Sequence, residues 1–254
     1  MLLTALILIS TSLLFAPISN VMLWRKYTNF TDGLSHASIM AAIIASLFGF
    51  NIIIGTILNT LIFMLLVYSL KSKTDNNLII TIISIFIMSF AFLLKDIYQI
   101  DVSLKKILFG DIKHSNYYDL LYISILILIT YPILFFNFNS IILISLNQDL
   151  AISKGINVKL IEALLLALIS LIVGICFKLI GVLMLFGIVI IPPTIARLVS
   201  KSPKEMIIKT IIISILTSLI SIILGKKFDI EISPLLICIN FIIFVIAKII
   251  RTGY

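Results

Sequence analysis

The sequence is poor in charge. Only 12% of its 254 residues are Asp, Glu, Lys or Arg, whereas about a quarter of the residues in soluble domains are charged. Hydrophobic residues make up 61% of the chain, and the mean hydropathy is +1.27. A soluble fold of this length would leave much of that apolar surface in water. The composition therefore predicts an integral membrane protein.

Reactive side chains are also scarce. The only cysteines, Cys176 and Cys238, stand far apart in apolar surroundings, which excludes a disulfide framework and a cysteine zinc cluster. No His-Glu-x-x-His motif is present. The tripeptide Gly225-Lys-Lys lacks the upstream glycine and the following Ser or Thr of a phosphate-binding loop. We therefore expect that the chain is not an enzyme and does not hydrolyse ATP.

The net charge of +8 does not indicate a nucleic-acid-binding protein. Lysines and arginines stand in short gaps between apolar runs, as they do beside membrane helices, and not as a stripe on a soluble face. The expected surroundings of the chain are therefore a lipid bilayer, with no nucleic-acid partner.

Nine apolar stretches are long enough, or nearly so, to cross a bilayer as helices. A helix is expected for each because an open strand in lipid would leave backbone polar groups unpaired. The second and third adjoin, so one of them is short, tilted or re-entrant. The first begins at Met1 without a basic segment, which favours a retained helix over a signal peptide. The sequence thus predicts an all-α polytopic membrane protein with eight or nine spans in a single domain, 1–254. The stretches are 2–24, 33–49, 51–70, 78–94, 119–136, 158–177, 179–198, 206–224 and 233–250.

Lysine and arginine in short loops predict the orientation of the chain. One alternating topology places nearly all of them on the same, cytoplasmic side, with the C-terminus inside and, for nine spans, the N-terminus outside. The exceptional segment 95–119 balances its lysines with aspartates and carries little weight. The cations on the cytoplasmic side are Arg25, Lys26, Lys71, Lys73, Lys154, Lys159, Arg197, Lys201, Lys204, Lys209, Lys248 and Arg251.

An aspartate and a histidine stand four residues apart at the beginning of the second span, Asp32 and His36. On a helix this spacing places both side chains on one face. One interpretation is structural: Asp32 caps the helix and His36 bonds to a neighbouring helix. The other is functional, because ionisable groups inside membrane spans are costly and typically mark a substrate path.

Carboxylate and imidazole are a natural ligand pair for Zn²⁺ or Mn²⁺. Two ligands alone bind such an ion weakly, but a two-fold dimer would bring together two of each and could complete a four-coordinate site. A transport site should also release its ion, so moderate affinity is expected. From these residues alone, passage of a transported metal past Asp32 and His36 and the structural interpretation both stay open, and no permanently bound cofactor is expected.

A polar segment, 147–157, separates two apolar runs on the predicted cytoplasmic side. It predicts a short amphipathic helix that ends at Gly155, a residue favoured just after a helix. An ordinary loop is the simpler interpretation, and a helix that docks into a partner's groove is the other. The candidate docking residues are Asn147, Gln148, Asp149, Leu150, Ala151 and Gly155.

A third feature lies in the stretch from Lys178 to Arg197. Gly181 and Gly187 permit close helix contact, and Pro192-Pro193 should interrupt the helical hydrogen bonds. A broken membrane helix is often a pore-lining element, although a structural kink fits equally well.

These segments together resemble one family, the metal-type ABC permeases, which are the membrane subunits of zinc and manganese importers. The match rests on four ordered blocks that, with their spacing, cover nearly the whole chain. Thr31 and Pro193 depart from the family pattern, and Asp229 lies in a stretch that matches only partly and receives no role. The blocks are Leu23-Trp-Arg-Lys-Tyr with Phe30-Thr-Asp-Gly-Leu-Ser-His-Ala; Leu108-Phe-Gly-Asp; Asn147-Gln-Asp-Leu-Ala-Ile-Ser-Lys-Gly-Ile; and Lys178-Leu-Ile-Gly-Val-Leu through Ile190-Ile-Pro-Pro-Thr-Ile-Ala-Arg.

The resemblance implies a homodimeric permease in a bacterial-type inner membrane. An ATP-binding subunit would bind each cytoplasmic face and use the ATP, and a metal-binding protein would deliver the ion from outside. By position, Asp32 and His36 match the family's residues for metal passage, and 147–156 matches the segment that contacts the ATPase. Zinc is favoured as the transported ion.

Other functions remain as alternatives. Manganese or iron(II) would suit the same two side chains. A stand-alone secondary transporter or channel, with Asp32 and His36 as a proton relay, would need no ATPase. A membrane-embedded enzyme is disfavoured because the spans contain too few polar side chains for an acid–base pair and a nucleophile.

Overall fold

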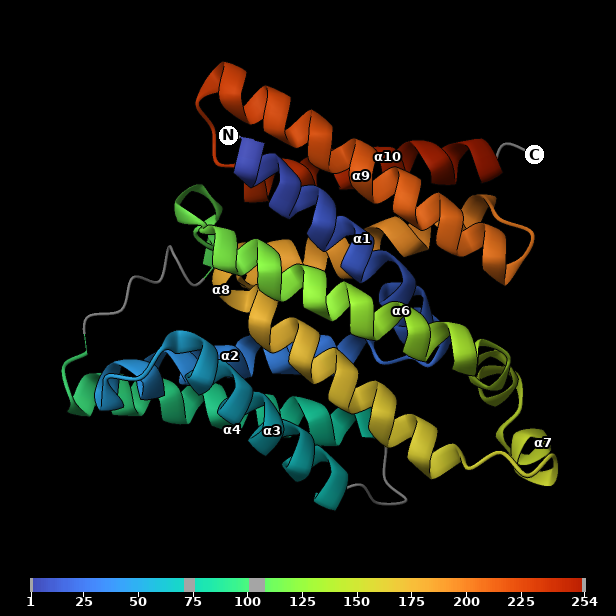
Figure 1. The fold of residues 1–254 in the computed structure, drawn as a ribbon, viewed down its shortest axis with the longest axis horizontal. Coiled ribbons are helices and arrows are strands. Elements are labelled where there is room, and N and C mark those ends of the chain that lie inside the picture. Colours follow the sequence, from blue (N-terminus) through green and yellow to red (C-terminus); the bar gives the residue numbers. More distant parts are fainter. Residues whose placement is uncertain (1, 71–75, 101–107, 253–254) are drawn as a thin grey trace.

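The computed structural model is a bundle of long helices, and it describes residues 2–70, 76–100 and 108–252 (Figure 1). All regular structure in these ranges is helical. The helices are α1 (Leu2–Trp24), α2 (Thr28–Phe48), α3 (Ile52–Leu70), α4 (Asn76–Ile97), η1 (Ile112–His114), α6 (Tyr117–Leu146), α7 (Gln148–Ser153), α8 (Val158–Val199), α9 (Pro203–Phe228) and α10 (Ile232–Thr252).

The predicted all-α membrane architecture is confirmed. Seven helical segments in the described ranges are long and apolar enough to cross a membrane, and two shorter apolar segments, His36–Phe48 and Ile54–Leu70, lie in α2 and α3. These nine segments correspond to the nine predicted stretches. The short pair is the adjoining pair that the sequence marked as short, tilted or re-entrant.

The helix α8 contains two of the predicted spans. Its backbone leaves helical geometry at Gly181 (φ 73°, ψ 167°), between the segments Val158–Phe177 and Leu179–Val199. Gly181 is one of the four residues named for the break, but the interruption expected at Pro192-Pro193 is wrong, because the helix continues through Gly187 and both prolines to Val199. Prolines are tolerated inside membrane helices, where neighbouring groups can pair the freed carbonyl, whereas the conformation of Gly181 lies outside the helical region altogether.

Small residues permit close approach between α2, α3, α4 and α8. A Cβ added to Gly55 of α3 would lie 2.7 Å from the Ala41 carbonyl oxygen of α2, and one added to Gly33 would lie 3.0 Å from Phe63 of α3 and Ile80 of α4. On α8, a Cβ at Gly174 would lie 3.0 Å from Thr60 of α3. Small residues at helix contacts are typical of membrane bundles, where apolar burial from water contributes little.

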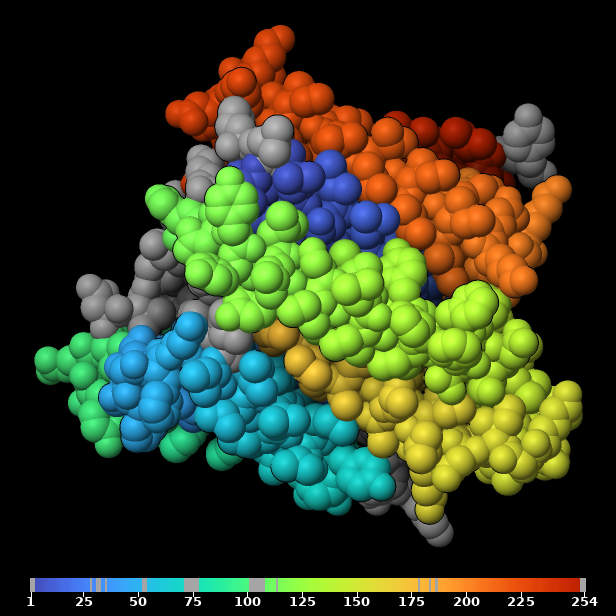
Figure 2. All heavy atoms as spheres, in the orientation of Figure 1, coloured from blue at the N-terminus to red at the C-terminus, as the bar shows by residue number. Residues whose placement is uncertain are grey.

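Buried polar groups connect α1 to α9. Ser12 and Ser218 hydroxyls lie 2.8 Å apart, and the Thr210 hydroxyl donates to Asn20 Oδ1 at 3.2 Å. On the outside of the bundle, α6 presents Leu128, Phe135 and Phe136, which are 72%, 79% and 82% exposed. Figure 2 shows α6 along this face, between α1 and the first part of α8. Large apolar side chains at such exposure are suited to contact with lipid tails.

The two ends of the bundle differ in what they contain. The short helix α7, the α8–α9 connection and the end of α10 lie at one end, and the beginning of α1 and the α9–α10 connection lie at the other (Figure 1). The end with α7 is the end that the charge pattern predicts to be cytoplasmic.

Candidate functional site

The helix α2 begins at Thr28, one turn earlier than the hydropathy pattern predicted. Its N-cap residue is Tyr27, so Asp32 is the fifth residue of the helix. The capping interpretation of Asp32 is therefore wrong, since an N-cap side chain can reach only the first turn. The helical backbone holds positions 32 and 36 one turn apart on the same face, as the spacing predicted.

The two side chains differ in what the structure describes. His36 is half-buried. The Asp32 side chain lies outside the described residues, so metal binding by the pair stays a prediction. Among the described residues, no three His, Cys, Asp or Glu side chains are grouped closely enough to hold a metal ion. A site completed by a second chain, as in the dimer argument, therefore also stays a prediction.

The surroundings of His36 are tightly packed. Its neighbours Ala37 and Ser38 are fully buried, and the Asn59 amide of α3 donates to the Ala37 carbonyl oxygen at 2.8 Å. The ring of Phe30 on α2 packs in a tilted arrangement against the ring of Phe63 on α3, with ring centroids 5.4 Å apart. The helix that carries the candidate pair is thus fixed rigidly to α3.

The predicted short helix in the segment 147–157 is present as α7. The Asn147 side chain caps it by accepting from the Leu150 N–H at 3.0 Å. Gly155 ends it with φ +76°, where its N–H donates to Ile152 O at 2.9 Å and the Ile156 N–H donates to Ala151 O at 3.1 Å. This pair of bonds is the Schellman motif, in which glycine is the preferred residue.

Most of α7 faces outward. Ala151 is fully buried, whereas Leu150 and Ile152 are 45% and 56% exposed and Gln148 and Asp149 are also exposed. Just before α7, Leu146 is 79% exposed. Three exposed apolar side chains thus lie on or just before this short polar helix, and we call the set Leu146, Leu150 and Ile152 the α7 patch. Such patches typically mark a protein contact.

The break in α8 is filled by another segment of backbone. Gly110 (φ +75°) and Gly181 (φ +73°) lie back to back, so that a Cβ on Gly181 would lie 2.3 Å from the Gly110 nitrogen. The neighbouring carbonyl of Phe109 accepts from the Ser233 hydroxyl of α10 at 2.6 Å. The block Leu108–Asp111 is therefore packed between the two halves of α8 and α10.

A largely buried ion pair at the α7 end was not predicted as a site. Arg25, interpreted from sequence only as an orientation signal, pairs with Glu162 of α8, and their side chains are 11% and 13% exposed. The guanidinium also donates to the Ile144 carbonyl oxygen of α6 at 3.0 Å. Removing one partner of a buried pair leaves an uncompensated charge and costs about 3–5 kcal/mol. The signal in the sequence was Glu162 itself, an acid within an apolar run.

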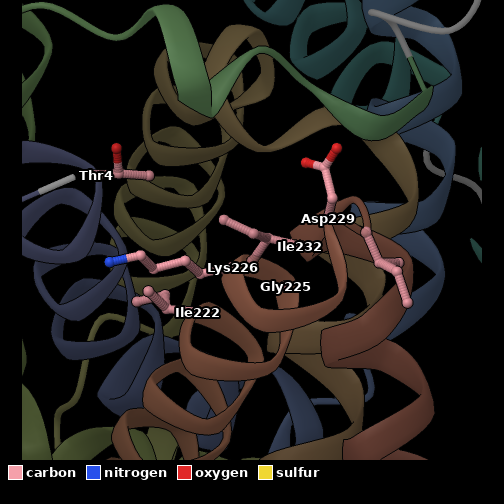
Figure 3. A pocket seen from close by; sticks show the side chains of 7 residues that line it. Thr4, Ile222, Gly225, Lys226, Asp229 and Ile232 are labelled. Carbon is pink, nitrogen blue, oxygen red and sulfur yellow. The ribbon is translucent and has the colours of Figure 1, made fainter.

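The opposite end of the bundle contains a pocket of about 330 Å³ between the beginning of α1 and the α9–α10 connection. Thr4, Lys226 and Asp229 contribute its polar lining (Figure 3). The Lys226 ammonium and the Asp229 carboxylate point in different directions (Figure 3), so they do not converge on one ligand. The second histidine, His114, is not among the residues that line this pocket; its Nδ1 lies 2.6 Å from Asp111 Oδ1, and its side chain is largely exposed.

These observations define a class of protein: a polytopic helical membrane protein with an aspartate and a histidine one turn apart on one span and a short, largely exposed helix at one end. The chain belongs to the ABC 3 transport family, whose model matches residues 1–251. It is the membrane-spanning permease component of an ABC transporter, in which ATP is hydrolysed by separate subunits.

Individual relatives agree with this assignment. The chain is 29% identical over 249 residues to the high-affinity zinc uptake system membrane protein ZnuB of Haemophilus influenzae, covering 97% of this chain and 94% of that protein. It is 30% identical to the ZnuB protein of Buchnera aphidicola subsp. Schizaphis graminum, covering 92% of this chain and 91% of that protein. The fold is similar to a chain of PsaBC from Streptococcus pneumoniae, solved in complex with a Fab, with a TM-score of 0.83 at 19% identity over 96% of this chain and 89% of that one.

Proposed function

We propose that this chain is the permease of an ATP-driven importer of divalent metal ions, and that zinc is the transported ion. The observation that carries the proposal is the placement of Asp32 and His36 one turn apart on α2, within a chain of the ABC 3 transport family. The names of the zinc uptake relatives support zinc over manganese or iron(II). Carboxylate and imidazole would suit all three ions.

In the proposed mechanism, a metal-binding protein delivers the ion to the end of the bundle that contains the N-terminus. Two copies of the chain form the permease, and the ion passes a constriction to which each copy contributes Asp32 and His36. Two carboxylates and two imidazoles would replace water around the ion while leaving the site weak enough to release it. ATP binding in the partner subunits supplies the free energy that switches access between the two faces.

The α7 end is the proposed cytoplasmic end, with the C-terminus inside. The helix α7 lies there together with the cationic α8–α9 connection, as the distribution of lysine and arginine predicts for the cytoplasmic side. An exposed amphipathic helix with the α7 patch is suited to a groove on an ATP-binding subunit. We assign to residues 147–157 the role of coupling segment.

The proposal is tested by reconstituting the chain in proteoliposomes with and without its ATP-binding subunit. We expect uptake of ⁶⁵Zn²⁺ only when the subunit, ATP and the metal-binding protein are all supplied. Uptake that proceeds without the ATP-binding subunit would instead support the secondary transporter. Competition by Mn²⁺ and Fe²⁺ in the same vesicles tests the identity of the ion.

A second prediction concerns the α7 patch. Replacing Ile152 with Asp should weaken binding of the ATP-binding subunit by roughly 30-fold, because charging an apolar anchor at the centre of an interface costs about 2 kcal/mol or more. The measurement is the amount of subunit that copurifies with the permease. Leu160→Asp is the matched control, since Leu160 is 58% exposed but lies on α8, outside α7. Equal copurification of both variants would contradict the docking role.

A further inference from the structure

The side chain of Arg25 connects three segments that surround the coupling segment. Arg25 follows the last residue of α1, and its Nη1 donates to the Ile144 carbonyl oxygen near the end of α6. Its Nη2 pairs with Glu162, in the second turn of α8. The helix α7 occupies the chain between Ile144 and Glu162. One guanidinium therefore holds the chain on both sides of α7.

The same residue leads directly into α2. Only Lys26 and Tyr27 separate Arg25 from the first residue of that helix. Tyr27 is the N-cap residue of α2, its N–H donates to Met22 O at 2.8 Å, and its ring centroid lies 5.5 Å from the Arg25 guanidinium carbon. Asp32 and His36 follow on the same rigid helix, about 6 Å and 12 Å along the axis from Thr28 at the usual rise of an α-helix.

The chemistry of the contact suits a mechanical connection. Both charged side chains are nearly buried, at 11% and 13% exposure, so little water is available to replace either partner if they separate. Arginine can serve a carboxylate and a carbonyl oxygen at once because its planar fork has five donors. A lysine at the same place would offer one small ammonium group and could not span both acceptors in the same fixed geometry.

We propose that Arg25 is a positioning residue that couples movement of α7 to movement of α2. When the ATP-binding subunit displaces α7, the flanking Ile144 and Glu162 move, and the guanidinium carries that displacement to the junction of α1 and α2. The start of α2 then shifts together with Asp32 and His36. This inference rests on the proposed function, since it takes α7 as the coupling segment and α2 as the metal-bearing helix.

The test uses the complete reconstituted transporter and measures zinc transported per ATP hydrolysed. In Arg25→Gln and Glu162→Gln we expect this ratio to fall at least tenfold, while ATP hydrolysis by the assembled complex stays within twofold of wild type. Lys26 is an exposed cation next to Arg25, so Lys26→Gln is the matched control. This variant should leave the ratio within twofold of wild type. An unchanged ratio in assembled Arg25→Gln complex would overturn the proposal.

Two further variants separate coupling from assembly. Arg25→Lys keeps the charge and should assemble, but we expect the transport ratio to fall by roughly threefold or more because the second acceptor is lost. The exchanged pair Arg25→Glu with Glu162→Arg should recover part of the ratio that either single reversal removes. If Arg25→Gln fails to assemble, these two variants decide: wild-type coupling in Arg25→Lys, or no recovery in the exchanged pair, would overturn the proposal.

The outcomes also distinguish this inference from the proposed function. Should the wild-type chain transport zinc without ATP, the proposed function fails whatever the Arg25 variants do. Should wild-type transport depend on ATP and Arg25→Gln keep the same zinc-to-ATP ratio, only the role of Arg25 fails.

Discussion

Replacing Asp32 or His36 with Ala should reduce ATP-dependent zinc uptake by about tenfold or more, because even an outer-shell partner of a metal site contributes about 10- to 100-fold in affinity. The double replacement should add little to either single one, since a site that has lost half its ligands already binds the ion weakly. The measurement is the initial rate of ⁶⁵Zn²⁺ uptake under zinc limitation. Metal-stimulated ATP hydrolysis should fall in parallel.

The matched control for these variants is Asn29→Ala. Asn29 is an exposed polar residue on the same helix, so its removal tests the general effect of truncating α2. Conservative changes sharpen the test further. His36→Cys retains a metal-binding side chain and should recover part of the zinc uptake, whereas His36→Gln should not. Normal uptake by correctly inserted Asp32→Ala and His36→Ala protein would remove both residues from the metal pathway.

Hydropathy located the spans well because lipid offers no hydrogen-bond partner for backbone polar groups. Each apolar run must therefore cross the membrane as a helix that pairs these groups internally. Residues 2–24 were predicted as one span and form α1 with the same bounds. Helix ends were less predictable. The predicted span 119–136 corresponds to α6, which continues to Leu146 and is about 45 Å long at 1.5 Å per residue. That length exceeds the roughly 30 Å hydrocarbon core, so hydropathy alone could not show where the helix stops.

The candidate site divides in a similar way. The i,i+4 spacing of Asp32 and His36 and the end of α7 at Gly155 are local features, so the sequence was sufficient to predict them. The pairing of Arg25 with Glu162 joins residues 137 positions apart, and no periodic pattern reports such a contact. The proline pair was misleading because prolines are tolerated inside membrane helices, where neighbouring groups can pair the carbonyl that a proline leaves free.

The largest effect on stability is expected at the crossing of Gly110 and Gly181. A Cβ on Gly181 would lie 2.3 Å from the Gly110 nitrogen, and a Cβ on Gly110 would lie 2.3 Å from the Leu179 carbonyl oxygen. Both opposing atoms belong to the backbone, so neither can rotate away. Gly181 also has φ 73° and ψ 167°, a region that is essentially restricted to glycine. Overpacking and backbone strain together should cost about 3 kcal/mol or more.

Gly181→Ala should therefore lower the apparent melting temperature in detergent by roughly 6 °C or more, as measured from the loss of monodisperse protein on heating. The cause is that the Leu108–Asp111 block can no longer pack into the break in α8, so the contact of Ser233 with Phe109 is lost as well. Gly49→Ala is the control, because Gly49 also has positive φ (+66°) but an added Cβ meets no atom within 4 Å. That variant should lose only about 1 kcal/mol from strain. Equal destabilisation of both variants would show that positive φ, and not the close crossing of two backbones, makes Gly181 necessary.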